Sequence, residues 1–314
     1  MSKKLTILDI AKLSGVGKST VSRVLTNDPK VKPETREKVE RVIAEHGYVP
    51  SKSAQSMRGG GVQKVIGVII SRLDSPSENK AVSSMLNVLY SAGYDVVIME
   101  SQFDPEKTNE HLSVLRKRNV EGVIVFGFTE LDIDKVSQWQ EKVVVIAMDT
   151  DQVSSINYDN HGLIRAVLNK LQAQGVNQLA YIGVDPKDKT TGLARLNAFQ
   201  NWCDDNDQHA EYRTGELHHE SAYQLVDEVV TDSLQAIVCA SDTLALGTIK
   251  RLQELGREDI VVTGVGGNEL LSFLFPNIYS IDPGYQQAGE KAANLLISQL
   301  TGNKTISHLT QEAV

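Results

Sequence analysis

Residues 6–26, TILDIAKLSGVGKSTVSRVLT, carry the side chains with the most specific chemical signal in the chain. If a helix begins at Gly17, apolar residues at helical spacing turn inward: Val21, Val24 and Leu25. The outer face then carries short polar residues and two cations: Gly17, Lys18, Ser19, Ser22 and Arg23. Hydroxyl groups near the start of a helix, with an arginine one turn later, suit the base edges and phosphates of DNA.

Two further helices are needed to position this face. Thr6 and Asp9 form a capping-box start, and apolar residues follow at helical spacing: Ile7, Ile10, Ala11 and Leu13. Ser14-Gly15-Val16 is a short turn with glycine at the bend. A third helix over 33–46 begins at a proline, ends before Gly47 and turns Val39, Val42 and Ile43 inward. The pattern predicts a helix-turn-helix head in residues 1–50.

The same residues allow two other interpretations. GVGKST resembles the end of a phosphate-binding loop, but that loop needs glycine where the chain has Lys12, and it follows a strand rather than an amphipathic helix. A solvated helical hairpin without a ligand is the second alternative.

Residues 51–61 are expected to form a hinge and linker. SKSAQSMR (51–58) is too short for a stable isolated helix, and three glycines follow it. Such a segment can fold on meeting DNA, with Met57 as an apolar wedge in the minor groove. The alternative is a plain linker. The candidate DNA contacts are Thr6, Gly17, Lys18, Ser19, Thr20, Ser22, Arg23, Asn27, Lys30, Ala54, Met57 and Arg58.

Charge is divided unevenly along the 314 residues. The formal net charge is −8, yet the first 60 residues hold 12 Lys and Arg against 6 Asp and Glu, whereas the remainder holds 20 against 34. A basic head on an acidic body suits a head that meets phosphate.

No export or membrane signal is visible in the sequence. The amino terminus lacks the apolar core of a secretory signal, and no apolar run approaches the roughly 20 residues that span a bilayer. We expect a cytoplasmic protein. Cys203 and Cys239 are interpreted as small buried residues without a disulfide.

From residue 65 onward, apolar strand patterns alternate with helical ones. The expected strands are 65–70, 94–99, 122–127, 143–148, 179–184, 236–241, 260–265 and 279–282, and the expected helices are 79–92, 105–118, 160–174, 191–206, 243–255 and 285–300. Continuous apolar runs are typical of parallel strands buried on both faces. The pattern predicts repeated βα units, either in one barrel or in two open sheets.

Ligands of open α/β sheets bind beyond the carboxyl ends of the strands. The residues that follow these strands combine carboxylates, amides and aromatic rings, which suit a polyhydroxylated ligand. Arg72 and Arg195 add a possible anion clamp, although each alone is also compatible with an ordinary ion pair. The candidate effector contacts are Ser71, Arg72, Leu73, Glu78, Asn79, Gln102, Phe128, Asp149, Thr190, Thr191, Arg195, Asp242 and Tyr285.

Catalytic signatures are weak. The sequence has no His/Cys cluster with metal-ligand spacing and no Gly-x-Ser-x-Gly elbow, and the pair His218-His219 is more typical of a solvated surface. We therefore expect no enzyme, no metal and no cofactor. The strand-end carboxylates leave a carbohydrate-cleaving enzyme as an alternative.

Residues 6–28 and 31–58 resemble the head and hinge of the LacI/GalR family of bacterial repressors. The resemblance extends over the body, which is similar to a periplasmic-binding-protein-like core. It implies a small all-α helix-turn-helix head on a core of two doubly wound parallel-sheet lobes. The implied core covers 62–314, with an N-lobe of about 62–158 and 284–304 and a C-lobe of about 159–283 plus the carboxyl-terminal segment.

The same resemblance implies partners and roles. Lys18, Ser19 and Arg23 match base-reading positions, and Ala54 and Met57 match the hinge helix, with methionine where many members carry leucine. Arg72 and Arg195 match candidate phosphate contacts, and Asp149 and Asp242 match positions that hold ligand hydroxyls. The implied partners are double-stranded operator DNA, a phosphorylated sugar and a second copy of the chain. A dimer is expected because no leucine-heptad tail follows residue 300.

Within the family, five segments narrow the expected effector: 71–79, 99–105, 116–129, 190–192 and 282–285. They resemble members that control trehalose uptake and breakdown, which implies trehalose 6-phosphate as the inducer. The alternatives are a regulator of another sugar operon, a member with a purine corepressor and a secreted sugar-binding protein, which would need a signal peptide and no basic head.

Overall fold

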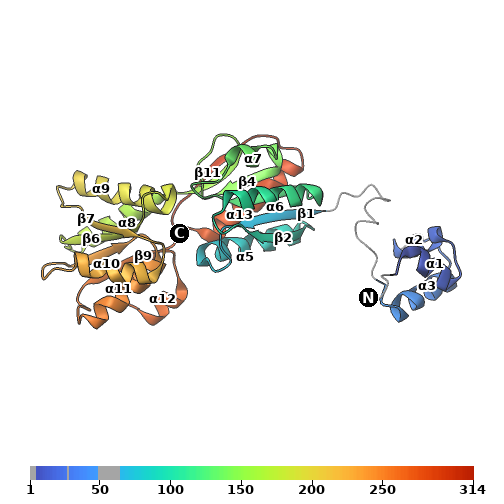
Figure 1. The fold of residues 1–314 in the computed structure, drawn as a ribbon, viewed down its shortest axis with the longest axis horizontal. Helices are drawn as coiled ribbons and strands as arrows, with labels where there is room; N and C mark the ends of the chain where they lie inside the picture. Colours follow the sequence, from blue (N-terminus) through green and yellow to red (C-terminus); the bar gives the residue numbers. More distant parts are fainter. Residues whose placement is uncertain (1–4, 27, 49–63) are drawn as a thin grey trace. The chain divides into compact units, whose positions relative to one another are not determined.

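The structure is a computed structural model that describes residues 5–26, 28–48 and 64–314. The chain divides into two compact units, residues 1–63 and 64–314, which we call the head and the core (Figure 1). Four predicted DNA contacts lie outside the described residues: Asn27, Ala54, Met57 and Arg58. The predicted hinge segment lies there too.

The described part of the head contains the three predicted helices: α1 (Ile7–Ser14), α2 (Lys18–Leu25) and α3 (Pro33–Glu45). Thr6 and Asp9 form the capping box of α1, and Gly15 ends it with φ 63°, a left-handed conformation that glycine adopts without strain. Ile10, Val21 and Val39 are fully buried where the three helices meet. Leu13 shares the helical spacing of α1 but is 49% exposed.

The first lobe of the core is built on a six-stranded parallel sheet with the strand order β11-β5-β4-β3-β1-β2. Its strands are β1 (Val65–Ile70), β2 (Asp95–Glu100), β3 (Gly122–Phe126), β4 (Val143–Ile146), β5 (Ser154–Tyr158) and β11 (His308–Gln311). Its helices are α5 (Pro76–Ser91), α6 (Pro105–Lys117), α7 (Ile133–Ser137) and α13 (Tyr285–Leu300), with a 3-10 turn, η1, over Gln140–Lys142.

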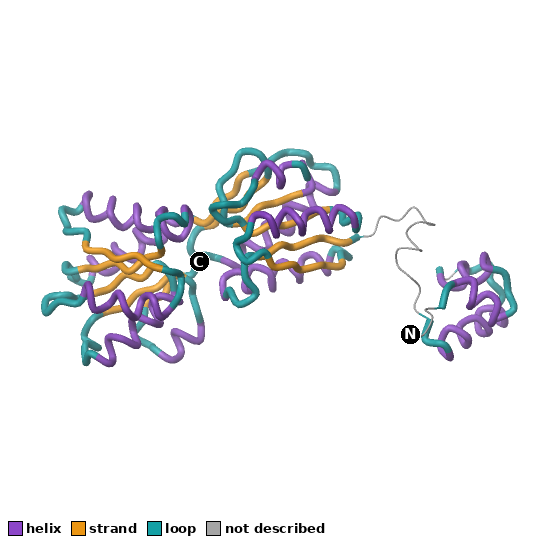
Figure 2. Tube along the Cα trace, viewed as in Figure 1, coloured by secondary structure: helices purple, strands orange, loops and turns teal. Residues whose placement is uncertain are grey.

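Both faces of this sheet are covered by helices, which explains its continuous apolar strands. Successive residues of β3 point to opposite faces: Ile124 packs in the cluster with α5 and α13, while Val123 and Val125 pack in the cluster with α6 and α7. Figure 2 shows the strands in orange between layers of purple helices.

The second lobe has a five-stranded parallel sheet with the strand order β10-β9-β8-β6-β7. Its strands are β6 (Leu179–Val184), β7 (Glu211–Gly215), β8 (Ala236–Cys239), β9 (Val261–Val265) and β10 (Tyr279–Ile281). Its helices are α8 (Asn160–Ala173), α9 (Arg195–Asp205), α10 (His219–Val229), α11 (Asp242–Glu254) and α12 (Glu269–Leu274), with a π-helical turn, η2, over Lys189–Ala194. These two open sheets decide against the single barrel that the βα pattern also allowed.

The carboxyl-terminal segment corrects the predicted lobe assignment. It was expected in the C-lobe, but β11 pairs with β5 at the edge of the first sheet. Ser155 donates its backbone N–H to Ser307 O, and Asp159 donates to Gln311 O. The backbone of 307–311 therefore completes the first sheet.

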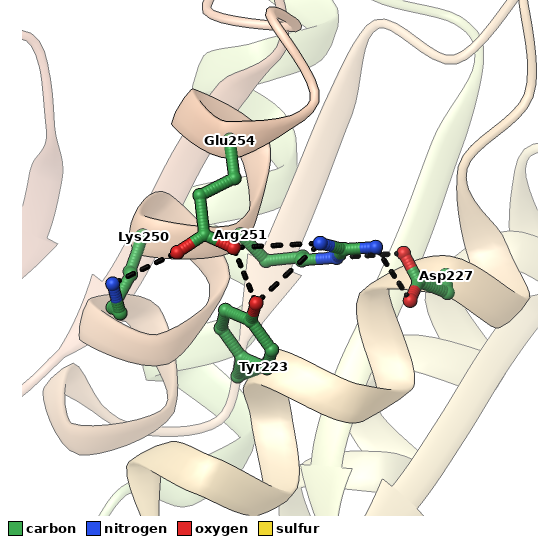
Figure 3. Close-up of polar contacts among 5 residues, drawn as sticks. All are labelled: Tyr223, Asp227, Lys250, Arg251 and Glu254. Carbon is green, nitrogen blue, oxygen red and sulfur yellow. Dashed lines mark hydrogen bonds and ion pairs between the residues drawn. The ribbon is translucent and has the colours of Figure 1, made fainter.

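Helices α10 and α11 are joined by a polar cluster (Figure 3). Arg251 donates from Nε and Nη2 to the two carboxylate oxygens of Asp227, at 2.8 and 2.9 Å. Glu254 accepts from Lys250 Nζ at 2.9 Å and from the Tyr223 hydroxyl. These hydrogen bonds lower the pKa of the Glu254 carboxyl to about 2, with Lys250 making the largest contribution. The cluster fixes the two helices to each other.

Two further expectations concern the interior. Cys203 and Cys239 are buried free thiols, as predicted, and burial raises the pKa of Cys203 to about 11 and that of Cys239 to about 12. Among the described residues, no helix combines the length and apolar character needed to cross a membrane.

Candidate DNA-binding head and effector cavity

The outer face of α2 has the composition predicted for a recognition helix. Val21 and Val24 are buried against α1 and α3, so Lys18, Ser19 and Arg23 turn to solvent. The side chain of Arg23 is 63% exposed and lies 3.8 Å from Asp28, a loose ion pair. Within the described residues α2 has no side-chain cap, which leaves its first-turn amide groups at the surface.

Thr6 has a local role as well. Its hydroxyl donates to Asp9 Oδ2 at 2.6 Å, and Asp9 N donates back to Thr6 Oγ1 at 3.4 Å. This predicted DNA contact therefore stabilises the start of α1, while Lys30 is exposed in the loop before α3.

A cavity of about 440 Å³ lies at the carboxyl ends of strands from both lobes of the core. The first lobe contributes residues that follow β1, β3 and β4, and the second contributes η2 and the start of α8 and α9. Nine predicted effector residues line it: Ser71, Arg72, Glu78, Phe128, Asp149, Thr190, Thr191, Arg195 and Tyr285. These nine residues follow the carboxyl ends of five different strands, β1, β3, β4, β6 and β10, as the strand-end rule predicts.

Four predicted residues are not among the lining of this cavity. Leu73 is 60% exposed, Asn79 donates from Nδ2 to Leu73 O at 3.0 Å, and Gln102 accepts from Lys107 Nζ at 2.9 Å. Asp242 lines a smaller adjoining cavity of about 90 Å³. Its two carboxylate oxygens accept from the Ser280 hydroxyl at 2.6 Å and from Asn268 N at 2.8 Å, so they already have protein partners.

Arg72 is placed to receive an anion. Its guanidinium lies 5.7 Å from the ring centroid of Phe103, and Nε lies 3.6 Å from Asp74 Oδ1, beyond hydrogen-bond distance. Within the described structure, that Nε is buried and has no hydrogen-bond partner. A buried donor without a partner costs free energy, and the Arg72 side chain as a whole stays 31% exposed and lines the cavity.

Arg195 is used differently. It is 3% exposed, its Nε donates to Asn160 Oδ1 at 2.8 Å, and its Nη1 donates to Ala240 O. Two of its nitrogens therefore tie the start of α8 to the end of β8. Arg195 still lines the cavity, and its Nη2 takes no part in these two bonds, so its expected contact with a phosphate stays a prediction.

Glu78 supplies the most perturbed carboxyl of the cavity. Burial raises its pKa to about 7, although Ser71 N donates to its Oε2 at 2.7 Å and Arg72 lies nearby. Near neutral pH the group is thus divided between its charged and protonated forms, and only the protonated form can donate a hydrogen bond.

Sequence comparison assigns the two units of the chain. Residues 6–51 match the bacterial regulatory proteins of the lacI family, and residues 168–313 match a periplasmic binding protein-like domain. The HTH-type transcriptional regulator TreR of Escherichia coli (strain K12) is 45% identical over 302 residues, which cover 96% of each chain. The chain belongs to the lacI family of bacterial regulatory proteins. It is a DNA-binding transcriptional regulator, as its relatives are, and not an enzyme.

Solved structures of lacI-family proteins share its fold. The trehalose repressor from Escherichia coli is 40% identical with a TM-score of 0.79, over 80% of this chain and 99% of that one. The Lac repressor bound to ONPG is similar in fold alone, at 23% identity and a TM-score of 0.84, over 99% and 98% of the two chains.

Several residues of the cavity of this lacI-family regulator were not found from the sequence. Phe103, Tyr158, Asp188 and Lys189 line it, together with Ser75, Ser77, Asn157, Asp159, Asn160 and His161. The ring of Phe103 meets Phe128 edge-on at 6.0 Å, and that of Tyr158 meets Tyr285 edge-on at 5.2 Å. Tyr158 ends β5, a strand that the apolar pattern did not reveal. Phe103 directly follows a predicted residue and could have been included by the strand-end rule.

Hydrogen bonds link the two lobes beside the cavity. Lys80 on α5 donates from Nζ to Gly266 O at 3.2 Å and to Gly267 O at 2.6 Å, and it lies 3.7 Å from Asp282. Across the cleft, Lys189 donates its backbone N–H to the Thr129 hydroxyl at 3.0 Å. Movement of one lobe against the other would therefore break or replace these hydrogen bonds of Lys80 and Lys189.

Metal ligation has no visible basis in the described part of the chain. No group of three or more His, Cys, Asp and Glu side chains there could hold a metal ion. The rings of His218 and His219, at the start of α10, are tilted by 33° to each other with centroids 4.2 Å apart.

Proposed function

We propose that the chain represses genes for trehalose uptake and breakdown, and that trehalose 6-phosphate releases it from its operator. The observation that carries this proposal is the mixed aromatic, acidic and cationic cavity at the strand ends of both lobes. It occurs in a chain 45% identical to TreR and 40% identical to a protein described as a trehalose repressor.

The lining suits a phosphorylated disaccharide. Phe103 and Phe128 offer apolar ring surfaces to sugar faces, and Asp149 offers carboxylate oxygens to sugar hydroxyls. Arg72 has a donor without a partner, and guanidinium groups bind phosphate well. A cavity of about 440 Å³ lies within the range of sites for small ligands.

The head supports a matching proposal for DNA. Two copies of the chain would present two α2 helices to the half-sites of a pseudo-palindromic operator. Lys18, Ser19 and Arg23 would contact bases or phosphates, and Met57 of the hinge would open the central step. Acting on operator DNA, the protein would work in the cytoplasm.

Induction would follow from a difference in lobe arrangement. A sugar phosphate held between the lobes favours one arrangement, and the hinge segments separate in that arrangement. A tenfold loss of operator affinity requires a coupling free energy of about 1.4 kcal/mol between the two sites.

An operator-binding titration tests this function. Fluorescence anisotropy of an operator fragment is measured with trehalose 6-phosphate, with trehalose and with unrelated sugar phosphates. We expect release by trehalose 6-phosphate at the lowest concentration. Release by another sugar phosphate instead would support the alternative of a different sugar operon, and tighter DNA binding on ligand addition would indicate a corepressor.

A further inference from the structure

The cavity contains a lysine that neither the strand-end rule nor the residue pattern selected. Among its lining residues Arg72, Lys189 and Arg195 are the arginines and lysines. Arg195 is buried with Nε and Nη1 already donating to Asn160 and Ala240. The remaining pair, Arg72 and Lys189, comes from opposite lobes.

The base of the Lys189 side chain is held in place by main-chain contacts. Its N–H donates to Thr129 Oγ1 across the cleft at 3.0 Å. On either side of it, Asp188 Oδ1 accepts from Thr190 N at 2.8 Å and from the Thr190 hydroxyl at 2.8 Å. The ammonium group itself makes no hydrogen bond or ion pair with any described residue, and the side chain is exposed.

Nearby carboxylates do not neutralise this ammonium in the described structure. Asp188 is the N-cap of η2, Asp159 is the N-cap of α8 with Oδ1 accepting from Gly162 N, and Asp149 accepts from Asn157 Nδ2 at 3.3 Å. Each acid has a local donor of its own. The lining therefore includes two cations whose donors these acids do not occupy, Arg72 from the first lobe and Lys189 from the second.

We propose that Lys189 is the second cation of the effector site and that it holds the phosphate of a sugar phosphate together with Arg72. This inference rests on the proposed function and deepens it. A dianion between these residues links the first lobe to the second, in the arrangement that also contains the Thr129–Lys189 hydrogen bond. Lys189 would then bind the phosphate through its ammonium group and contact the other lobe through its backbone N–H.

The test measures phosphate selectivity, the ratio of Kd for the parent sugar to Kd for its phosphate, by calorimetry on the full chain. The wild type is compared with Lys189→Met, which keeps the aliphatic stem, and with Lys189→Arg, which keeps the charge. Lys187→Met is the matched control, because Lys187 is an exposed lysine two residues away that does not line the cavity. The ligand pairs are trehalose, glucose and sucrose with their 6-phosphates, and inorganic phosphate is titrated alone.

We expect Lys189→Met to reduce the selectivity for trehalose 6-phosphate about tenfold, the size of one charge-assisted hydrogen bond. Trehalose affinity should stay the same, Lys189→Arg should retain most of the selectivity, and Lys187→Met should match the wild type. Equal selectivity in the Lys189→Met and Lys187→Met variants would overturn the assignment of Lys189.

The two proposals fail in different ways. If glucose or sucrose phosphate is the selective ligand and Lys189→Met loses that selectivity, Lys189 is confirmed and the trehalose proposal is wrong. If the wild type prefers no phosphorylated sugar to its parent sugar, the Lys189 inference is wrong. Inorganic phosphate binding as tightly as every sugar phosphate would assign the site to the free anion and would overturn the inference of a sugar phosphate.

Discussion

At the scale of single residues, two arginines that both follow a predicted strand differ in burial and in hydrogen-bond partners. Arg72 and Arg195 both follow strand ends, and the sequence placed them together as a clamp. Arg72 is 31% exposed at its side chain and keeps a donor without a partner, whereas Arg195 is 3% exposed and donates to Asn160 and Ala240. Burial and partners depend on the tertiary structure and could not be read from spacing.

This difference predicts that the same substitution lowers stability far more at Arg195 than at Arg72. Arg195→Met leaves Ala240 O without its donor in the interior, so we expect the free energy of unfolding to fall by about 2–4 kcal/mol. Arg72→Met removes only a long ion pair and should cost less than about 0.5 kcal/mol, while weakening the binding of a sugar phosphate more than that of its parent sugar. Urea unfolding followed by fluorescence of Trp139 and Trp202, both in the core, measures stability. Equal losses of stability would contradict the assigned roles.

Glu78 should make stability depend on pH in an unusual direction. Its folded pKa of about 7 exceeds the ordinary value of 4.5, so the folded protein binds the proton more tightly. Stability therefore falls as pH rises from about 4.5 to 7 and stays lower above that range. Glu78→Gln keeps an acceptor for Ser71 N but does not titrate. Its free energy of unfolding, relative to that of the wild type, should therefore increase by about 1–2 kcal/mol as the pH rises from 5 to 8, after allowance for partial exposure. A pH-independent difference between the two unfolding curves would rule out this titration.

At the scale of helices and strands, the predictable elements are those whose burial is purely apolar. The apolar run VIGVII predicted β1, and the helical spacing of Val21 and Val24 predicted α2. Strand β5, SSINY, was missed because buried serines line it: Ser154 Oγ accepts from Gln299 Nε2 at 2.7 Å and from Ser307 N at 3.0 Å. These partners lie about 150 residues away, so no local pattern identifies them. Because β5 was not predicted, Tyr158 at its end was not included in the predicted site.

The exposed face of α2 yields a prediction for DNA binding. Arg23→Ala removes a cation from that face, and we expect operator affinity to fall by about 1–3 kcal/mol, or roughly 5- to 150-fold. Arg41→Ala on α3 is the control, since Arg41 is similarly exposed and pairs with Glu37 one turn away. Anisotropy on operator and scrambled DNA separates base contact from phosphate contact. Equal affinities of the two variants would reject α2 as the recognition helix.

At the scale of the whole molecule, the core consists of two lobes that share a cavity and the contacts beside it. Lys80 reaches Gly266 and Gly267 from one side, and Thr129 accepts from Lys189 on another. The chain leaves the first sheet after β5 and returns to the first lobe before α13. As a result β5 and β11, which are far apart in the sequence, are neighbours at one edge of the first sheet. Ligands that favour one lobe arrangement can therefore act on segments remote from the cavity.

Thr129→Val tests the contact between the lobes apart from phosphate recognition. It removes the acceptor for Lys189 N and leaves both cations in place, so the arrangement with this contact loses one hydrogen bond, about 0.5–1.5 kcal/mol. We expect a two- to tenfold loss of affinity for trehalose and for trehalose 6-phosphate alike. Calorimetry with both ligands measures it. A loss confined to the phosphate would instead place Thr129 at the anion itself.

The most direct test of the proposed mechanism is anisotropy of an operator fragment with the full-length protein at fixed, modest ionic strength, with and without saturating trehalose 6-phosphate. We expect tight binding without ligand and at least tenfold weaker binding with it, while unphosphorylated trehalose has a much smaller effect. Operator affinity that is the same with and without trehalose 6-phosphate would contradict the mechanism.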